Sequence, residues 1–256
     1  MTSPRRIGSL THVRSWILTY HSLDTSGSVI STDPRVFREQ MDSLAETGTR
    51  VVPLEQIQHT PGAVALTFDD GFQNFYEHAY PVLRDRRFPA TVFVVTGFCG
   101  STNNWPSQPA NPPVPRLPLM GWSELREVAA ANITLGSHTC THPYLPELSA
   151  AQLDEELRVS RLSLEDQLGQ PVTSFAYPYG AATPGVQAAV GRHYQLACGT
   201  KLAYLSEDSD ATELPRLDTY YLQKRMWFKS LSRQYGAAYI AMRRSLREAR
   251  SGWSKA

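Results

Sequence analysis

The chain has 256 residues, of which 41% are hydrophobic and 19% charged, a balance typical of a globular protein that buries its core without disulfide bonds. Its formal net charge of +1 gives no general affinity for nucleic acid or for an acidic polymer. The three cysteines are odd in number and widely spaced, which excludes a disulfide framework and a C-x-x-C zinc ribbon.

The first half of the chain alternates short apolar runs with longer helical patterns. Asp33 followed by Pro34 is typical of a helix start, and Gly48 is typical of a helix stop. In chain order, the patterns predict a strand over 15–20, a helix between Asp33 and Gly48, strands over 50–53 and 63–68, a helix over 74–86 with a kink or break at Pro81, and a strand over 90–95.

A proline-rich connection over residues 97–120 comes next, and a loop of this length in a compact domain is usually functional or disordered. Strands that alternate with helices favour an α/β fold with parallel strands, whose carboxyl ends carry the functional loops. The second half predicts helices over 123–131, 149–168 and 185–191, and strands over 133–135, 172–176 and 194–198.

Polar residues directly follow four of the predicted strands. If these strands are parallel neighbours, the four clusters converge on one face of the fold. The clusters are Tyr20-His21, Asp69-Asp70-Gly71, His138 with His142, and Tyr177-Pro178-Tyr179-Gly180.

Two of these clusters have the residue types of a metal site. Asp69 and Asp70 raise each other's pKa unless a cation neutralises one of them, and a divalent metal would leave one aspartate as ligand and the other as base. His138 and His142 lie four positions apart, so both rings reach one metal if the segment turns helically. Two histidines and a carboxylate match a catalytic zinc site with open positions. The alternatives are an ordinary Asp-Asp-Gly turn and two unrelated loop histidines.

The order T-F-D-D-G, S-H-T-C-T-H and F-A-Y-P-Y-G resembles the polysaccharide deacetylase family (NodB homology, carbohydrate esterase family 4) over residues 15–220. The segments I-L-T-Y-H-S-L and L-P-R-L-D resemble the branch that contains poly-N-acetylglucosamine deacetylases. The resemblance implies an irregular (β/α) barrel of about seven parallel strands. It also implies a metal-dependent hydrolase that removes N-acetyl groups from an amino sugar and releases acetate.

The resemblance further implies a role for each matching residue. Asp69 would be the general base that activates water. The backbone N–H of Tyr179, after Pro178, would stabilise the tetrahedral oxyanion together with a divalent metal, most often Zn²⁺. The implied metal ligands are Asp70, His138 and His142.

Two positions depart from the family pattern. The third motif often begins with an arginine that orients the catalytic aspartate, but this chain has Ala176 there, so another group must hold Asp69. No histidine follows His193, so the late histidine that supplies the general acid is missing. His21 is the candidate replacement, either as acid for the leaving amine or as a sugar contact. The alternative for His21 is a structural histidine.

Aromatic residues near the clusters are candidate sugar contacts, because aromatic faces offer a large contact area at a modest entropy cost. Tyr177 and Tyr179 belong to the third motif, and Trp105 lies in the proline-rich loop. For Trp105 the alternative is that it anchors its own loop.

The chain is predicted to comprise an N-terminal extension (1–14), a deacetylase domain (15–222) and a basic amphipathic helical tail (223–256). From Lys224 onward, nine basic residues are opposed only by Glu248, a net charge of +8 that leaves −7 on the rest of the chain. A helix with an apolar stripe beside such charges is of a kind that lies on anionic membrane surfaces. The alternative is that the stripe packs on the domain.

We therefore expect an N-acetylated saccharide or lipid-linked saccharide as substrate, and no nucleic-acid partner. We expect a cytoplasmic location, peripheral to the membrane if the tail binds lipid, because the run Trp16-Ile17-Leu18 is too short for a signal peptide. The alternatives for function are an O-acetyl esterase, a deacetylase of a non-sugar amide and a catalytically silent saccharide-binding protein.

Overall fold

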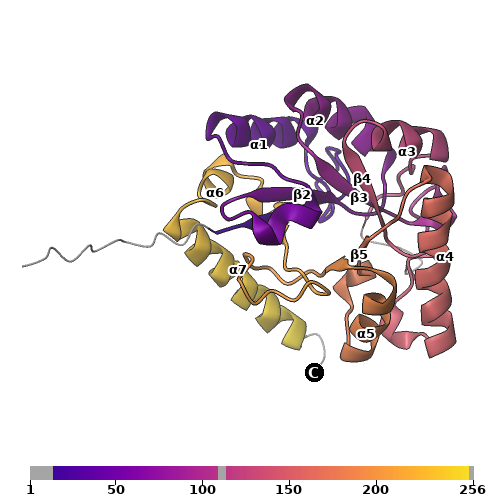
Figure 1. Ribbon diagram of the computed structural model, residues 1–256. Coiled ribbons are helices and arrows are strands. Elements are labelled where there is room, and N and C mark those ends of the chain that lie inside the picture. The colour runs from indigo at the N-terminus through magenta and orange to yellow at the C-terminus, as the bar shows by residue number, and fades with distance from the viewer. Residues whose placement is uncertain (1–13, 109–113, 254–256) are drawn as a thin grey trace, which may run out of the picture.

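Seven parallel strands form one sheet in the order β6-β5-β4-β3-β2-β1-β7. The sheet curls into a half-barrel with helices around it, so the predicted α/β fold with an irregular barrel is confirmed. This computed structural model describes residues 14–108 and 114–253 (Figure 1). The strands are β1 (Trp16–Tyr20), β2 (Val64–Phe68), β3 (Ala90–Val94), β4 (Ile133–Ser137), β5 (Ser174–Ala176), β6 (Leu196–Cys198) and β7 (Leu217–Asp218).

Three of the predicted features lie partly outside the described residues, and for the C-terminal tail these are residues 254–256. The N-terminal extension over 1–14 is described only at Arg14, and the proline-rich loop is not described over residues 109–113.

Seven α-helices lie in the described ranges and cover the sheet. In Figure 1, α1, α2 and α3 lie in a row along one side, α4 and α5 lie at one end of the molecule, and α6 and α7 lie at the other. None of the described helices is long and apolar enough to cross a membrane. The helices are α1 (Pro34–Glu46), α2 (Tyr80–Arg86), α3 (Trp122–Ala129), α4 (Ala150–Leu168), α5 (Pro184–His193), α6 (Arg225–Lys229) and α7 (Gln234–Trp253).

The predicted helix boundaries have local physical causes. The Asp33 side chain accepts a hydrogen bond from the Arg35 N–H and caps α1. Ser149 and Gln152 form a reciprocal capping box at the start of α4. Gly169 ends α4 with a φ of +67°, a left-handed conformation that costs glycine nothing.

Some sequence predictions were wrong in detail. The strand predicted over 50–53 is reduced to one bridge between Val51 and Val64, and a short 3₁₀-helix (Leu54–His59) follows it. By contrast, the helix predicted over 74–86 with a kink or break at Pro81 is confirmed in outline: a π-helical turn (Phe75–Ala79) becomes α2 at Tyr80, next to Pro81. Because proline lacks an N–H, the regular hydrogen-bond ladder cannot continue through it. The two-residue strand β7 is too short for a sequence pattern to predict.

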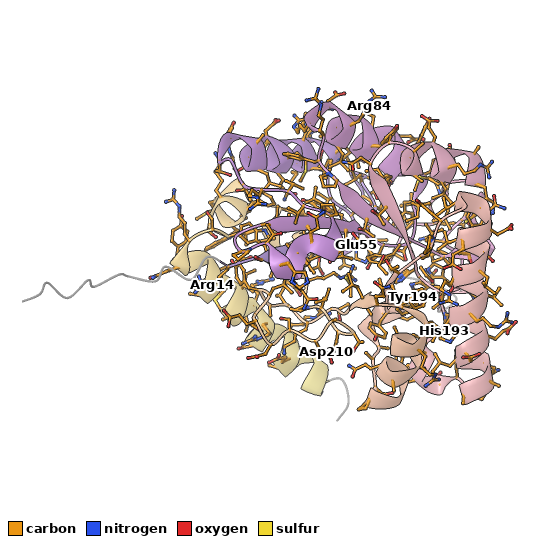
Figure 2. All side chains as sticks on the ribbon, in the orientation of Figure 1. Arg14, Glu55, Arg84, His193, Tyr194 and Asp210 are labelled. Atoms are coloured by element: carbon orange, nitrogen blue, oxygen red, sulfur yellow. The ribbon has the colours of Figure 1, made fainter. Side chains whose placement is uncertain are left out.

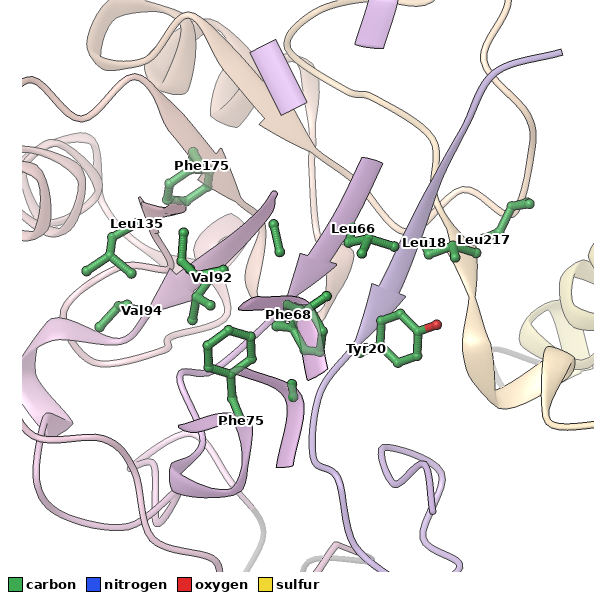
Figure 3. Close-up of a cluster of buried hydrophobic side chains, with 14 of the residues drawn as sticks. Leu18, Tyr20, Leu66, Phe68, Phe75, Val92, Val94, Leu135, Phe175 and Leu217 are labelled. Carbon is green, nitrogen blue, oxygen red and sulfur yellow. The ribbon is translucent and has the colours of Figure 1, made fainter. Parts of the chain in front are cut away.

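The core lies between the sheet and the helices. Strands β1, β2 and β3 are buried along their whole length, as expected for parallel strands covered on both faces. Figure 3 shows Leu18, Leu66, Val92, Leu135 and Phe175, from five successive strands, in one apolar layer. Burying each such side chain contributes about 1.5–3 kcal/mol relative to leaving it exposed. This layer fixes the strands in register, and their carboxyl ends therefore meet at one edge.

The C-terminal helices are part of the same packed body. Phe228, Leu231 and Ile240 are buried, and the rings of Trp227 and Tyr239 stack with centroids 4.0 Å apart. Other apolar side chains of these helices remain exposed, namely Met226, Tyr235, Met242 and Leu246.

Candidate active site

A cavity of about 420 Å³ opens at the carboxyl ends of the strands. The four polar clusters predicted from the sequence meet there, which the parallel order of the strands explains. Of the nine predicted site residues, only Pro178 does not line the cavity, and its side chain is buried. The eight that do are His21, Asp69, Asp70, Trp105, His138, His142, Tyr177 and Tyr179.

Asp69 follows β2 and is held by Arg216. The Arg216 Nη1 and Nη2 atoms each donate a hydrogen bond of 2.7 Å, one to each carboxylate oxygen of Asp69. Arg216 also donates to the Gly199 carbonyl and to the Thr67 hydroxyl, so its position is fixed from several sides. Burial alone would raise the pKa of Asp69, but the charge and hydrogen bonds of Arg216 hold that pKa well below its ordinary value.

Arg216 is the site residue that the sequence reasoning missed. Ala176 stands at the position where the family usually has an arginine, so another group has to hold Asp69, and Arg216 does this. Arg216 lies just before β7. The only signal was its place in the L-P-R-L-D segment, which carried a resemblance but no assigned role. The order β2-β1-β7 brings it beside Asp69.

Asp70, His138 and His142 form a compact buried group. One ligand atom of each lies within 4.8 Å of the others. The Asp70 Oδ1 atom is 3.4 Å from His138 Nε2 and 3.5 Å from His142 Nε2. Asp70 has a φ of +72° and is followed by Gly71 at +76°, a tight turn that lets both adjacent aspartates reach the cavity.

The two histidines reach Asp70 by a different route from the predicted helical turn. Residues 138–144 are not helical, and Thr139 and His142 both have a positive φ, of 70° and 55°. The Thr139 hydroxyl accepts a hydrogen bond from the His142 backbone N–H and stabilises this turn. Left-handed backbone at non-glycine residues is unfavourable, and it occurs where the surrounding structure enforces it.

Neighbouring groups orient the two rings. The His138 Nδ1 atom is 2.8 Å from the Ala176 carbonyl, which leaves Nε2 facing Asp70. Trp105 is 4% exposed and stacks on the His142 ring with centroids 4.9 Å apart. Burial, together with the charge of His138, lowers the pKa of His142 to about 3, so this ring is neutral at neutral pH.

The group has the donors of a divalent-cation site. Two imidazoles and one carboxylate are the ligand types of catalytic zinc, and neutral imidazole is the form that binds metal. Asp70 Oδ1, the oxygen that faces both histidines, is buried without a hydrogen-bond partner, although buried polar atoms are normally satisfied. The residues therefore fit a divalent cation. Among the described residues, no other such ligand group was found.

His21 follows β1 and lies beside Asp69 in the same cavity. Its Nε2 atom is 3.7 Å from Asp69 Oδ2, and 26% of its side chain is exposed. Asp218, at the end of β7, also lines the cavity. His21 is thus close to the carboxylate and accessible to a ligand at the same time.

Tyr177 and Tyr179 form different parts of the cavity wall. Tyr177 is buried and its hydroxyl donates to the Thr212 carbonyl, so only its ring remains to face a ligand. Tyr179 is half exposed, with its ring against His142 and its hydroxyl 2.8 Å from the Ser107 hydroxyl. Its φ of +58° belongs to a turn that continues through Gly180, where an added Cβ would lie 2.0 Å from the Thr200 hydroxyl.

Another cavity and another histidine lie apart from these residues. A cavity of about 490 Å³ is lined by Arg14, Gln58 and Tyr204 among others, and none of the clustered ligands lines it. His193 Nε2 is 2.8 Å from Asp154 Oδ1 on α4, and Figure 2 shows His193 next to this helix. The chemistry-bearing groups are therefore concentrated in the strand-end cavity.

Residues 56–196 match the family model described as polysaccharide deacetylase. Among curated relatives, the Bacillus subtilis protein YxkH is 25% identical over 210 residues, which cover 78% of this chain and 70% of that protein. The poly-β-1,6-N-acetyl-D-glucosamine N-deacetylase of Escherichia coli K12 is 28% identical over 211 residues, 64% of this chain. The match covers only 30% of the Escherichia coli protein.

Solved structures share the fold. IcaB from Ammonifex degensii superimposes with a TM-score of 0.68 at 24% identity, over 84% of this chain and 97% of that chain. The Streptococcus pyogenes deacetylase PplD, solved with acetate, gives a TM-score of 0.70 at 23% identity, over 81% and 93%.

Proposed function

The chain belongs to the polysaccharide deacetylase family, and from this premise we propose that it hydrolyses the N-acetyl amide of an amino sugar and releases acetate. One observation carries the proposal: a carboxylate held ionised by Arg216 lies beside a buried Asp-His-His group in the same cavity. The Escherichia coli relative, named as an N-deacetylase of poly-β-1,6-N-acetyl-D-glucosamine, supports an N-acetylated sugar as the substrate.

In this proposal Asp70, His138 and His142 hold a divalent cation. We propose Zn²⁺, because two imidazoles and one carboxylate are the ligand types of catalytic zinc. When bound, the cation supplies Lewis-acid polarisation of the acetyl carbonyl. The Ala176 carbonyl and the Trp105 ring hold the two imidazoles in position for it.

Asp69 takes a proton from the attacking water in the proposed reaction. Arg216 keeps the carboxylate ionised and fixes both of its oxygens, so the base is oriented before substrate arrives. As the water oxygen bonds to the acetyl carbon, the backbone N–H of Tyr179 donates to the developing oxyanion. His21 gives a proton to the departing amine nitrogen as the C–N bond breaks, and acetate and a free amino sugar leave.

Acetate release tests the proposal. The zinc-loaded protein is incubated with N-acetylglucosamine oligomers, a lipid-linked N-acetylated amino sugar and acetylated xylan, with Asp69→Asn as the inactive control. We expect acetate from an N-acetylated sugar only. Release from xylan alone would assign an O-acetyl esterase, and no metal-dependent release from any of them would assign a saccharide-binding protein.

We also propose that the C-terminal helices contact an anionic membrane surface, where a lipid-linked substrate would be found. The support is the exposed side chains of Met226 and Met242 in a segment of net charge +8. Co-sedimentation with phosphatidylglycerol vesicles should fall in a Met226→Gln, Met242→Gln variant, which leaves the buried residues of these helices intact. Equal sedimentation of both proteins would refute this contact.

A further inference from the structure

Helix α7 contributes a cation to the wall of the 420 Å³ strand-end cavity, which is called the catalytic cavity below. Arg247 lines this cavity together with Tyr221 and Thr200. Its Nη1 atom donates a hydrogen bond of 3.0 Å to the Thr200 carbonyl, which holds the guanidinium at the wall. A guanidinium has five N–H donors in a planar fork, so one such bond leaves donors for a ligand.

A second cation lies one helical turn away on the same face of α7. The Arg243 guanidinium lies over the Tyr221 ring, with Cζ 4.6 Å from the ring centroid. Its Nε atom is buried without a hydrogen-bond partner, an uncommon state for a charged donor. A small cleft of about 80 Å³ is lined by Tyr221, Arg243, Leu246 and Arg247. Tyr221 and Arg247 line both the cleft and the catalytic cavity, so the two spaces adjoin.

The acidic residues of the cavity do not account for both cations. Asp69 is engaged by Arg216, and Asp70 faces the two histidines. Burial raises the pKa of Asp218 above its ordinary value, although the charges of His21 and Arg247 act to lower it. Asp218 carries at most one negative charge, so it cannot balance both guanidiniums.

The neighbouring arginine behaves differently. Arg244 lies on the next face of α7, where its Nε atom is 4.0 Å from Glu248 Oε1. If the basic residues of α7 served only solubility, each would be expected to pair with an acidic residue, as Arg244 does, or to face solvent. Arg243 instead lies over the Tyr221 ring, and Arg247 lines the same cleft as that ring at the edge of the cavity.

We infer that Arg243 and Arg247 form an anion subsite beside the catalytic cavity, and that the preferred amino-sugar substrate carries a phosphate or a carboxylate close to its N-acetyl group. The inference rests on the proposed function and adds the chemical class of the substrate. Arginine recognises both anions through paired N–H donors, and these charge-assisted bonds are about twice as strong as neutral ones. An uncharged homopolymer would offer no counter-charge to either guanidinium.

The test uses substrates that differ only in charge. The zinc-loaded protein is assayed on an N-acetylglucosamine trisaccharide, on the same trisaccharide with a phosphate monoester at its reducing end, and on one that ends in glucuronic acid. The readout is the ratio of kcat/KM for each anionic substrate to that for the neutral one. We expect a ratio of about 10 or more for the wild type. The preferred anion separates the phosphate source from the carboxylate source.

Matched variants assign the preference to these two residues. The ratio should fall toward one in an Arg243→Gln, Arg247→Gln variant and recover in part in the corresponding lysine variant. Arg244→Gln removes the same charge from the same helix and should keep the wild-type ratio. Thermal unfolding of each variant separates loss of the subsite from loss of the fold, since a merely structural role would lower the Tm without changing the ratio.

A binding measurement decides the inference without turnover. Calorimetric titration with glucosamine and with glucosamine 1-phosphate should show at least about 10-fold tighter binding of the anionic sugar, lost in the double glutamine variant. Equal binding of the two sugars by the wild type, or a preference that survives in the double variant, would overturn the subsite. Absence of acetate release from every trisaccharide with the binding preference intact would count against the proposed function alone.

Discussion

Arg216 and Asp69 lie 147 positions apart in the sequence, and two hydrogen bonds of 2.7 Å join the guanidinium to the carboxylate. Both side chains are buried, so this ion pair is shielded from solvent. A buried pair of this kind costs desolvation energy that its mutual attraction and its other hydrogen bonds must offset. Arg216 meets that condition through Gly199 and Thr67, and the result is a carboxylate fixed in direction and protonation state.

Replacing Arg216 by glutamine should change the pH dependence of the reaction. In the wild type the pKa of Asp69 is held below its ordinary value, so its protonation should not limit kcat/KM in the neutral range. Without the guanidinium, burial dominates and raises that pKa, which moves the acid limb of the profile to higher pH. We expect kcat/KM at pH 7 to fall about 100-fold. Arg126→Gln, on exposed α3 surface, is the control and should leave the profile unchanged.

The stability of the Arg216→Gln variant should depend on pH in a matching way. A depressed folded-state pKa stabilises the wild type above the unfolded pKa of about 4, and this is lost as the pH falls through the folded pKa. In the variant the ionised carboxylate is buried without its partner, which costs about 3 kcal/mol or more at pH 7. Urea unfolding at pH 3 and pH 7 should show a gap that widens at the higher pH. A gap independent of pH would contradict the ion pair as its cause.

Removing the metal should abolish activity without unfolding the chain. The three proposed ligands are buried, and Thr139 stabilises the turn that carries the two histidines, so dialysis against a chelator should lower kcat more than about 100-fold and leave the fold intact. Added Zn²⁺ should restore activity and raise the Tm, because a ligand of the native state stabilises it. His142→Ala should show less than one metal per chain by elemental analysis, with no restoration. Full activity of the chelated protein would exclude the proposed site.

Replacing His21 by glutamine should lower kcat and leave metal content unchanged. His21 lies 3.7 Å from Asp69 but is not part of the Asp-His-His group, so its loss removes a proton donor and keeps the ligands. A general acid contributes about 100-fold or more. His59→Ala, at an exposed position, is the control. Unchanged turnover in the His21 variant would make this histidine structural.

Trp105 should affect the metal more than the sugar. Because its ring stacks on His142 and only 4% of the residue is exposed, Trp105→Ala frees the imidazole to rotate. We expect metal affinity to fall about 10-fold, measured by competition with a zinc chelator. Trp105→Phe keeps an aromatic ring against His142 and should recover most of the affinity. A rise in KM with metal affinity unchanged would instead assign Trp105 to the sugar.

The sequence by itself determined the features that depend on neighbours along the chain. Short apolar runs predicted the five-residue strands, and Asp33 with Pro34 predicted the start of α1, because both signals arise from contacts within a few residues. The motif spacing also gave Asp69 and Asp70 as a pair. The apolar pattern failed at β7, because two residues are too few to show a periodicity. It also failed over 50–53, where only Val51 pairs with another strand.

Only the tertiary structure decided which distant groups meet. The strand order β2-β1-β7 puts Arg216 against Asp69 in place of the arginine that Ala176 replaces, and no local pattern encodes that order. The left-handed turn that directs His142, and the cations that α7 brings to the cavity, likewise depend on packing between remote segments. The physical reason is that secondary structure follows short-range hydrogen bonding and periodicity, whereas side-chain partners follow from how the completed elements pack.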